Sequence, residues 1–387
     1  MNLANRLRQR RFVLGYTLDE VTELVKKQGY TISKAAVSKY ELGKSVPNAT
    51  NLWHLACVLE ASPEYFLKAP RFEIQWIAFR KNYALSKKEI EKIRYFAKEQ
   101  VEARLFLNEV LGLDIELPEN RKYAIKKYED VEEVALAIRE KWKIDKWPIE
   151  SLSSTLESKS IFLVEIESAH QFDGVSGWID DTYPLIITSK NTPVDRKRMN
   201  IAHEFAHTVL DIRNEAINEE KAAFRLAAAL LIPEGAIKNA LGNRRKKVDL
   251  QELVLLKEDY GISVQALIRR CYDLQIISEV VYKRMNIMLR SRGMHLNEPG
   301  ECKNKEKPIM VKGRLLRAIA EGYTTESEVL SRFPALASEI ELSQKPGSWK
   351  AKDESELLRK SAQKLKSEYA QDGTLSDLEI IDDLYEY

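Results

Sequence analysis

Residues 199–210 read MNIAHEFAHTVL, and the pentapeptide His203-Glu204-Phe205-Ala206-His207 at their centre decides the fold. Residues four apart on an α-helix share a face, so both imidazoles point to one side. There they can bind one zinc ion, while Glu204 faces the metal-bound water. With 5 histidines among 387 residues, chance gives only about 0.01 such pentapeptides. The alternative is a surface helix that meets no metal, and a third ligand would decide between the two.

The next segment supplies two candidates for that third ligand. It is rich in alanine, begins with Glu219 and Glu220 and ends at Pro233, which predicts a strong helix. We prefer Glu220, because it shares a face with the apolar residues that would pack on the helix carrying the motif. Glu219 falls about 100° away, toward solvent. Glu219 as the ligand stays open, and the other interpretation of Glu220 is an acid that interacts with the helix dipole.

Two segments, DRKRMNIAHEFAHTVL (195–210) and EKAAFRLAAALLIP (220–233), resemble the ImmA/IrrE family of bacterial zinc metallopeptidases. Residues 172–193 resemble the strand pair that precedes the active helix of that family, and residues 256–278 resemble its helical extension. The likeness spans about residues 130–290. It implies an α+β zincin-like (gluzincin) peptidase domain, which we place at residues 121–295.

The resemblance also implies roles for single residues. His203, His207 and Glu220 would bind Zn²⁺, and Glu204 would be the catalytic general base. Many members of the family carry Asp or Asn four residues after the ligand glutamate, and this chain has Phe224 there. The metal site therefore lacks one expected hydrogen-bonding partner.

The segment before the motif predicts how a substrate is held. Tyr183–Ser189 (YPLIITS) is rich in β-branched residues and is expected to pair with the substrate backbone as an added strand. The donor that stabilises the oxyanion is not evident from the sequence. Tyr183, Arg196 and Arg198 are candidates, and the alternative is that they are ordinary surface residues.

Residues 1–70 have the pattern of a small helical DNA-binding domain. A basic first helix is followed by a helix capped by Thr17, a turn at Gly29 and a second short helix at Ser33–Leu42. Together with Gly43-Lys44, the tetrapeptide Ser38-Lys39-Tyr40-Glu41 resembles the Xre family of helix-turn-helix repressors. The resemblance implies binding to a double-stranded DNA operator as a homodimer.

Specific side chains in this domain are predicted to contact DNA. Ser33, Lys34, Ser38 and Lys39 would reach the bases from the N-terminal half of the recognition helix. Lys44 and Arg10 would contact phosphates instead. Glu41 is expected to be structural and paired with an arginine of the first helix. The alternative is a helical bundle that binds protein rather than DNA.

Composition limits the remaining classes of function. The chain has 387 residues, which predicts two to three domains, and a net charge of only +2, so any DNA affinity must come from a local patch. Its 3 cysteines are widely spaced, which argues against disulfides and a cysteine zinc site. No apolar run is long enough for a signal peptide or a membrane span, so we expect a cytoplasmic protein.

The other segments are predicted from their patterns. Residues 71–112 read as helical, with Ser86 capping a long helix, and 71–120 is a helical linker or dimerisation segment. Residues 296–347 read as a linker with short helices, and 348–387 as an amphipathic helix with an acidic tail. Apolar anchors in that tail would bind a basic partner: Leu375, Leu378, Ile381, Leu384 and Tyr385. Alternatively, the tail packs on its own protein.

Two functions from different classes follow. In the first, a mainly α protein with a small β-sheet regulates transcription through a zinc-dependent endopeptidase domain that cleaves a repressor or partner protein. In the second, the chain is an antitoxin and autorepressor of a toxin–antitoxin operon. Its acidic tail would then neutralise a toxin, and its zinc fold would be catalytically weak or inactive. The complete ligand set favours the first function, while Phe224 and the acidic tail favour the second.

Overall fold

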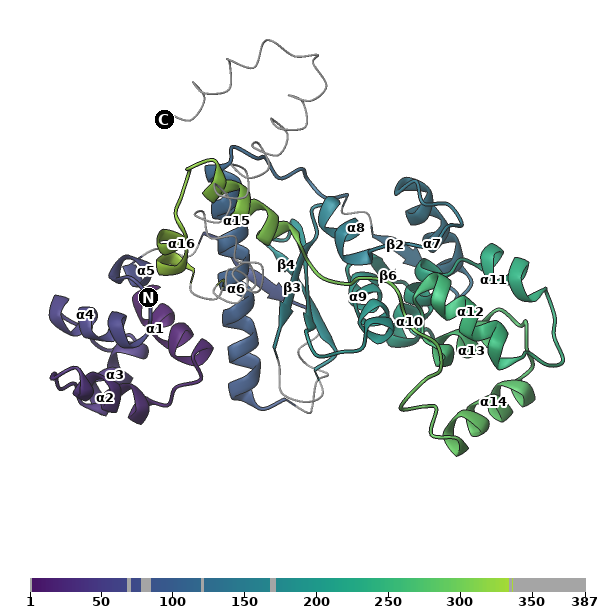
Figure 1. Cartoon of the computed structure of the whole chain (residues 1–387), viewed down its shortest axis with the longest axis horizontal. Coiled ribbons are helices and arrows are strands. Elements are labelled where there is room, and N and C mark those ends of the chain that lie inside the picture. Colours follow the sequence, from purple (N-terminus) through teal and green to yellow (C-terminus); the bar gives the residue numbers. More distant parts are fainter. Residues whose placement is uncertain are drawn as a thin grey trace, which may run out of the picture. The chain divides into compact units, whose positions relative to one another are not determined.

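The computed structural model describes residues 2–67, 71–77, 85–119, 122–167, 172–333 and 336. The chain divides into two compact units, residues 1–336 and 337–387. The second unit, which contains the predicted acidic tail and its apolar anchors, lies outside the described residues. The first unit is mainly helical with a small mixed sheet, which confirms the predicted fold class (Figure 1).

The N-terminal residues form a bundle of five helices. Three of these helices begin at good N-cap residues, Thr17, Ser33 and Asn48. Each of these side chains accepts a hydrogen bond from a backbone amide in the first turn of its helix. The bundle closes over its own core, which includes Val21, Val25, Leu55 and Phe66. The helices are α1 (Asn2–Val13), α2 (Leu18–Lys27), α3 (Lys34–Glu41), α4 (Ala49–Val58) and α5 (Pro63–Leu67).

This bundle is attached to the long helix α6 (Lys87–Val110) by buried polar contacts. Arg6 of α1 donates two hydrogen bonds to the Glu102 carboxylate, at 2.8 and 3.0 Å. Gln9 donates to the backbone oxygen of Tyr95. Arg10 is only 2% exposed and donates to the backbone oxygen of Leu59. The prediction that Arg10 contacts DNA phosphates is therefore wrong, because packing against α6 buries its guanidinium.

A four-stranded sheet lies between α6 and the helix that carries the His-Glu-x-x-His motif (Figure 1). Its order is β1-β4-β5-β3; β4 is antiparallel to both β1 and β5, and β3 is parallel to β5. Apolar residues of α6 and the sheet form one core, among them Ala97, Val101, Phe162 and Val175. The strands are β1 (Ile74–Trp76), β3 (Phe162–Ile166), β4 (Gly174–Ile179) and β5 (Tyr183–Ser189).

The sheet corrects two predictions. Residues 71–112 are not helical throughout, because Phe72, Ile74 and Trp76 alternate with polar residues and β1 forms there. The second correction concerns β5 (Tyr183–Ser189), whose two neighbours are β4 and β3. Both of its backbone edges are paired, so β5 cannot accept a substrate as an added strand.

A third core surrounds the motif helix α9 (Val194–Val209) and is built mainly from helices. Helix α10 (Glu219–Leu231) packs on α9 and α7 through its alanine-rich face. Two short strands, β2 (Tyr123–Ile125) and β6 (Leu210–Ile212), form a separate parallel pair, and β6 directly follows α9. The other helices are α7 (Asp130–Lys141), α8 (Leu152–Ser158), α11 (Glu234–Leu241), α12 (Leu250–Tyr260), α13 (Val264–Asp273) and α14 (Glu279–Ser291).

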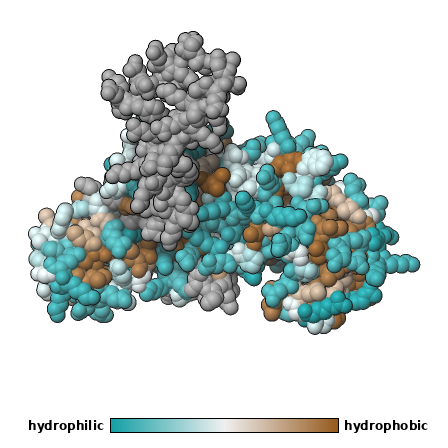
Figure 2. Space-filling model, in the orientation of Figure 1, coloured by the Kyte–Doolittle hydropathy of each residue, from teal (hydrophilic) through white to brown (hydrophobic). Residues whose placement is uncertain are grey.

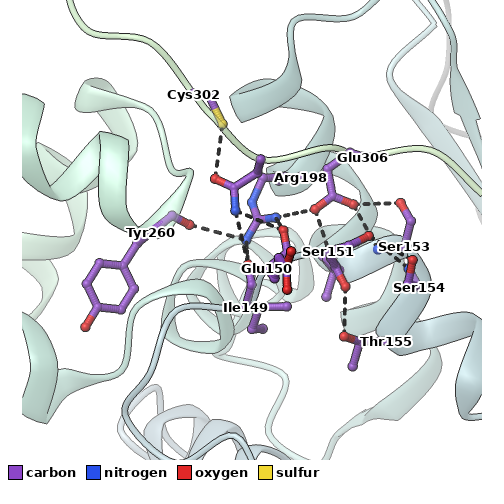
Figure 3. A network of polar contacts seen from close by, with 12 residues as sticks. Ile149, Glu150, Ser151, Ser153, Ser154, Thr155, Arg198, Tyr260, Cys302 and Glu306 are labelled. Carbon is purple, nitrogen blue, oxygen red and sulfur yellow. Dashed lines mark hydrogen bonds and ion pairs between the residues drawn. The ribbon is translucent and has the colours of Figure 1, made fainter. Parts of the chain in front are cut away.

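Residues 298–306 follow these helices and are bound to the domain at several points (Figure 3). The Glu298 carboxylate accepts hydrogen bonds from two backbone amides at the start of α13. Asn304 donates to the backbone oxygens of Ile149 and Glu150. Glu306 pairs with Arg198 of α9, and both side chains are completely buried. The segment that composition assigns to a linker therefore lies against the domain and leads into α15 (Met310–Ala320) and α16 (Glu326–Arg332).

The described residues include no helix that is both long and apolar enough to cross a membrane. On the face drawn in Figure 2, apolar and hydrophilic side chains alternate over the surface.

Candidate metal centre

The motif helix α9 presents its two histidines on the side that faces α10. Ile201, Ala202 and Ala206 belong to the apolar core, which fixes the rotation of the helix. With that face buried, His203 and His207 turn toward the first turn of α10. His203 and His207 are each 8% exposed, whereas the Glu220 side chain is partly exposed, so the group of three is open to solvent on the Glu220 side.

Three side chains bring possible metal ligands together, with one atom from each lying within 4.8 Å of the others. The Nε2 atoms of His203 and His207 lie 3.2 Å apart. Glu220 places Oε2 3.3 Å from Nε2 of His203 and Oε1 3.8 Å from Nε2 of His207. A tetrahedral zinc with bonds of about 2.0–2.1 Å sets its ligand atoms about 3.3 Å apart. Within the part of the chain that the structure describes, no other group of three such side chains comes together in this way.

Glu219, the alternative ligand, contacts the other side of one imidazole. Its Oε1 lies 3.1 Å from Nδ1 of His207, whereas the Glu220 carboxylate lies beside the Nε2 atoms. A carboxylate that accepts a hydrogen bond from Nδ1 leaves Nε2 deprotonated and aimed at the metal. The two neighbouring glutamates therefore differ in position: Glu220 lies where it could hold a metal together with both Nε2 atoms, and Glu219 contacts the Nδ1 side of His207.

Glu204 lies on the sheet side of the centre. Glu204 is 8% exposed, and its carboxylate accepts a 2.8 Å hydrogen bond from the hydroxyl of Ser176 on β4. Burial raises the pKa of Glu204 above its usual range, and the hydrogen bond from Ser176 opposes that shift. A Cβ atom on Gly174 would lie 3.0 Å from Cγ of Glu204, so this strand passes very close to the carboxylate.

Sequence reasoning missed Ser176. The available signal was the alternation of β4, which puts Gly174 and Ser176 on one face of the strand. The sequence does not show which face meets α9, because that depends on how the sheet packs.

Phe224 stands four residues after Glu220, one turn further along α10. Its ring packs on the imidazole of His203, with 4.0 Å between ring centroids, and is half exposed. A phenyl ring fixes the orientation of that imidazole by contact but accepts no hydrogen bond from it. Phe224 also lines a cavity of about 850 Å³ that runs past Met199 and Asn200.

The three candidate oxyanion donors are not brought to the metal centre. Arg198 is fully buried and bonded to Glu306, contrary to its interpretation as a surface residue (Figure 3). Tyr183 donates to the backbone oxygen of Ile115. Arg196 is exposed and forms a 2.8 Å ion pair with Asp173 in the wall of the cavity.

The residues predicted to contact DNA lie on or near α3. The Ser33 hydroxyl caps that helix by accepting a hydrogen bond from the backbone amide of Ala36. Lys34 forms a 2.7 Å ion pair with Asp19. Lys39 and Lys44 are exposed, and Ser38 is partly exposed. Glu41 is buried and accepts two 2.6 Å hydrogen bonds from Arg11 of α1, which confirms its predicted structural role.

Residues 159–272 match the family model of the IrrE N-terminal-like domain (Peptidase_M78). The match covers less than a third of the 387-residue chain but includes all of β4, β5, α9 and α10. It supports the resemblance to the ImmA/IrrE family for this part of the chain, and the N-terminal bundle lies outside it. No curated protein matches the chain.

Proposed function

We propose that this protein is a DNA-binding regulator with a zinc-dependent endopeptidase domain, which cleaves a repressor or partner protein. One observation carries the peptidase proposal: His203, His207 and Glu220 bring their possible ligand atoms within 4.8 Å of one another, and Glu204 directly follows His203 on the same helix. The match to an IrrE N-terminal-like domain supports the same reaction class.

The chain's own residues would divide the reaction as follows. Zinc, when held by His203, His207 and Glu220, supplies an activated water and polarises the scissile carbonyl. Glu204 takes the proton of that water and delivers it to the departing amine. Ser176 holds the carboxylate of Glu204 in one orientation.

Metal analysis of the purified protein tests the ligand set. We expect about one zinc per chain in the wild type and loss of the metal in Glu220→Ala, because two imidazoles alone leave the tetrahedron incomplete. The matched variant Glu219→Ala should still take up zinc, with roughly 10–100-fold weaker affinity, because only the orientation of His207 is relaxed. A wild-type protein that takes up no zinc after reconstitution, or a Glu220→Ala protein that retains it, would contradict the proposal.

The DNA-binding part of the proposal rests on α3 and on its resemblance to Xre repressors. Lys39→Ala should weaken binding to DNA from upstream of the protein's own gene by about tenfold, because a base-contacting side chain contributes roughly 1–3 kcal/mol. Fluorescence anisotropy at fixed salt measures it. Lys246→Ala, in the exposed loop between α11 and α12, serves as the control for loss of one positive charge. Equal affinity of all three proteins would show that α3 is not the recognition helix. A homodimer remains a proposal, tested by the molar mass of the free protein.

Phe224 favours a second candidate, an antitoxin and autorepressor whose zinc domain is catalytically weak. In that case the tail anchored by Leu375, Leu378, Ile381, Leu384 and Tyr385 would bind a toxin. Deletion of residues 372–387 should then make cells sensitive to a toxin encoded beside this gene. Normal growth with that neighbour expressed would argue against the second candidate.

A further inference from the structure

Strand β4 is the part of the sheet that borders the metal centre. Ser176 donates a hydrogen bond to Glu204, and a Cβ atom on Gly174 would lie 3.0 Å from Cγ of Glu204. The inner edge of β4 is paired with β5 along its whole length. The outer edge is paired with β1, from Trp76 opposite Gly177 to Ile74 opposite Ile179.

This outer edge is where an extended peptide would have to pair. Peptides that add to a sheet need backbone N–H and C=O groups on an edge. Because β5 is enclosed by β4 and β3, the outer edge of β4 is the backbone edge nearest to Glu204 in the described sheet. Ile77 already donates to the backbone oxygen of Ser176, the same residue whose side chain holds Glu204.

β1 itself has the properties of a short bound peptide. It has three residues, of which Gln75 is exposed and the other two are partly exposed. Two aspartates of the β4–β5 turn also bind this segment. Asp180 accepts a hydrogen bond from the backbone amide of Glu73, and Asp181 accepts one from the side-chain amide of Gln75. Ile74 and Trp76 pack against the core but are only partly buried, and a short, partly buried strand is the kind of element that opens locally.

Gly177 permits the close approach of β1. A Cβ atom at this position would lie 2.7 Å from the backbone oxygen of Gln75, and the φ angle of Gly177 is one that alanine adopts without strain. The glycine is therefore required by the neighbouring strand and not by its own backbone conformation.

We propose that β1 occupies the substrate edge of β4, and that an extended peptide segment binds by displacing it. The inference rests on the proposed peptidase function for its purpose, since it names the mode in which that site takes its substrate. In the free protein β1 pairs with residues 177–179 of this edge, and a peptide that extends along β4 from the metal centre would have to take that place.

Hydrogen–deuterium exchange of the full-length protein tests whether β1 can be released separately. Gly177→Ala places a methyl group against Gln75, and Ile77→Pro removes the donor to Ser176. Each should speed the exchange of the amides in residues 74–76 by roughly tenfold while the amides of β5 stay protected. The matched control is Gly235→Ala, because a Cβ atom there meets nothing within 4 Å. If neither variant loosens β1, this strand is a fixed part of the sheet and the proposal fails.

Binding of an unstructured polypeptide completes the test. All variants are placed in the zinc-loaded Glu204→Gln background, which cannot turn over the probe, and fluorescein-labelled β-casein is titrated by anisotropy. Loosened β1 should tighten binding about fivefold or more, and Gly235→Ala should leave it unchanged. Faster exchange of β1 without tighter binding would overturn the inference. Tighter binding combined with no cleavage of β-casein by the Glu204-containing protein would leave the strand exchange standing and remove the peptidase function.

Discussion

Glu204→Gln is expected to reduce peptide hydrolysis by roughly 10²–10⁴-fold, the usual contribution of a positioned general base. Glutamine has nearly the same shape and can still accept the hydrogen bond from Ser176, so the fold and the three candidate ligands should be undisturbed. It cannot take a proton from water. The measurement is the rate at which zinc-reconstituted protein cleaves β-casein, together with the zinc content of the same samples.

Ser176→Ala provides the graded companion to that experiment. It leaves the Glu204 carboxylate in place but removes the hydrogen bond that orients it. We expect a smaller loss of rate than for Glu204→Gln, with zinc content unchanged in both variants. Cleavage by Glu204→Gln at the wild-type rate would show that another group takes the proton, and that Glu204 has only a structural role.

The convergence of His203, His207 and Glu220 was largely predictable because the two helices that carry them are close in sequence. Helical periodicity alone puts His203 and His207 on one face, and the apolar stripe of the next helix selects Glu220 over Glu219. What periodicity cannot give is the contact between separate elements. Ser176 lies 28 residues before Glu204, and the register of β4 against α9 decides their meeting.

The arginines show the same limit. The first helix reads as basic and amphipathic, and three of its arginines prove to be buried: Arg6, Arg10 and Arg11 are each less than a tenth exposed. Arg11 pairs with Glu41, which the sequence predicted, because both belong to one small bundle. Arg6 pairs with Glu102, which lies 96 residues further along the chain, so its burial follows from the docking of the bundle on α6. A charge pattern identifies arginines but does not say which of them face solvent.

The second large effect is expected at Glu306, which composition assigned to a linker. Its carboxylate pairs with Arg198 of the motif helix and accepts the amides of Leu152 and Ser153 at the start of α8 (Figure 3). Glu306→Ala would leave the Arg198 guanidinium buried without its counter-charge. Removal of one partner from a buried ion pair costs about 3–5 kcal/mol. We therefore expect a large fall in the thermal unfolding midpoint of the full-length protein.

The matched control is Glu301→Ala, which removes an exposed carboxylate five residues earlier in the same segment. It should leave the unfolding midpoint almost unchanged, because an exposed charge contributes little. Hydrogen–deuterium exchange separates a local from a global effect: in Glu306→Ala the amides of Leu152 and Ser153, which donate to this carboxylate, should lose protection first. Equal stability of the two variants would mean that residues 298–306 contribute little to the fold. A loss confined to Glu306→Ala would instead make this segment part of the structure that holds α9, and with it the metal centre, in place.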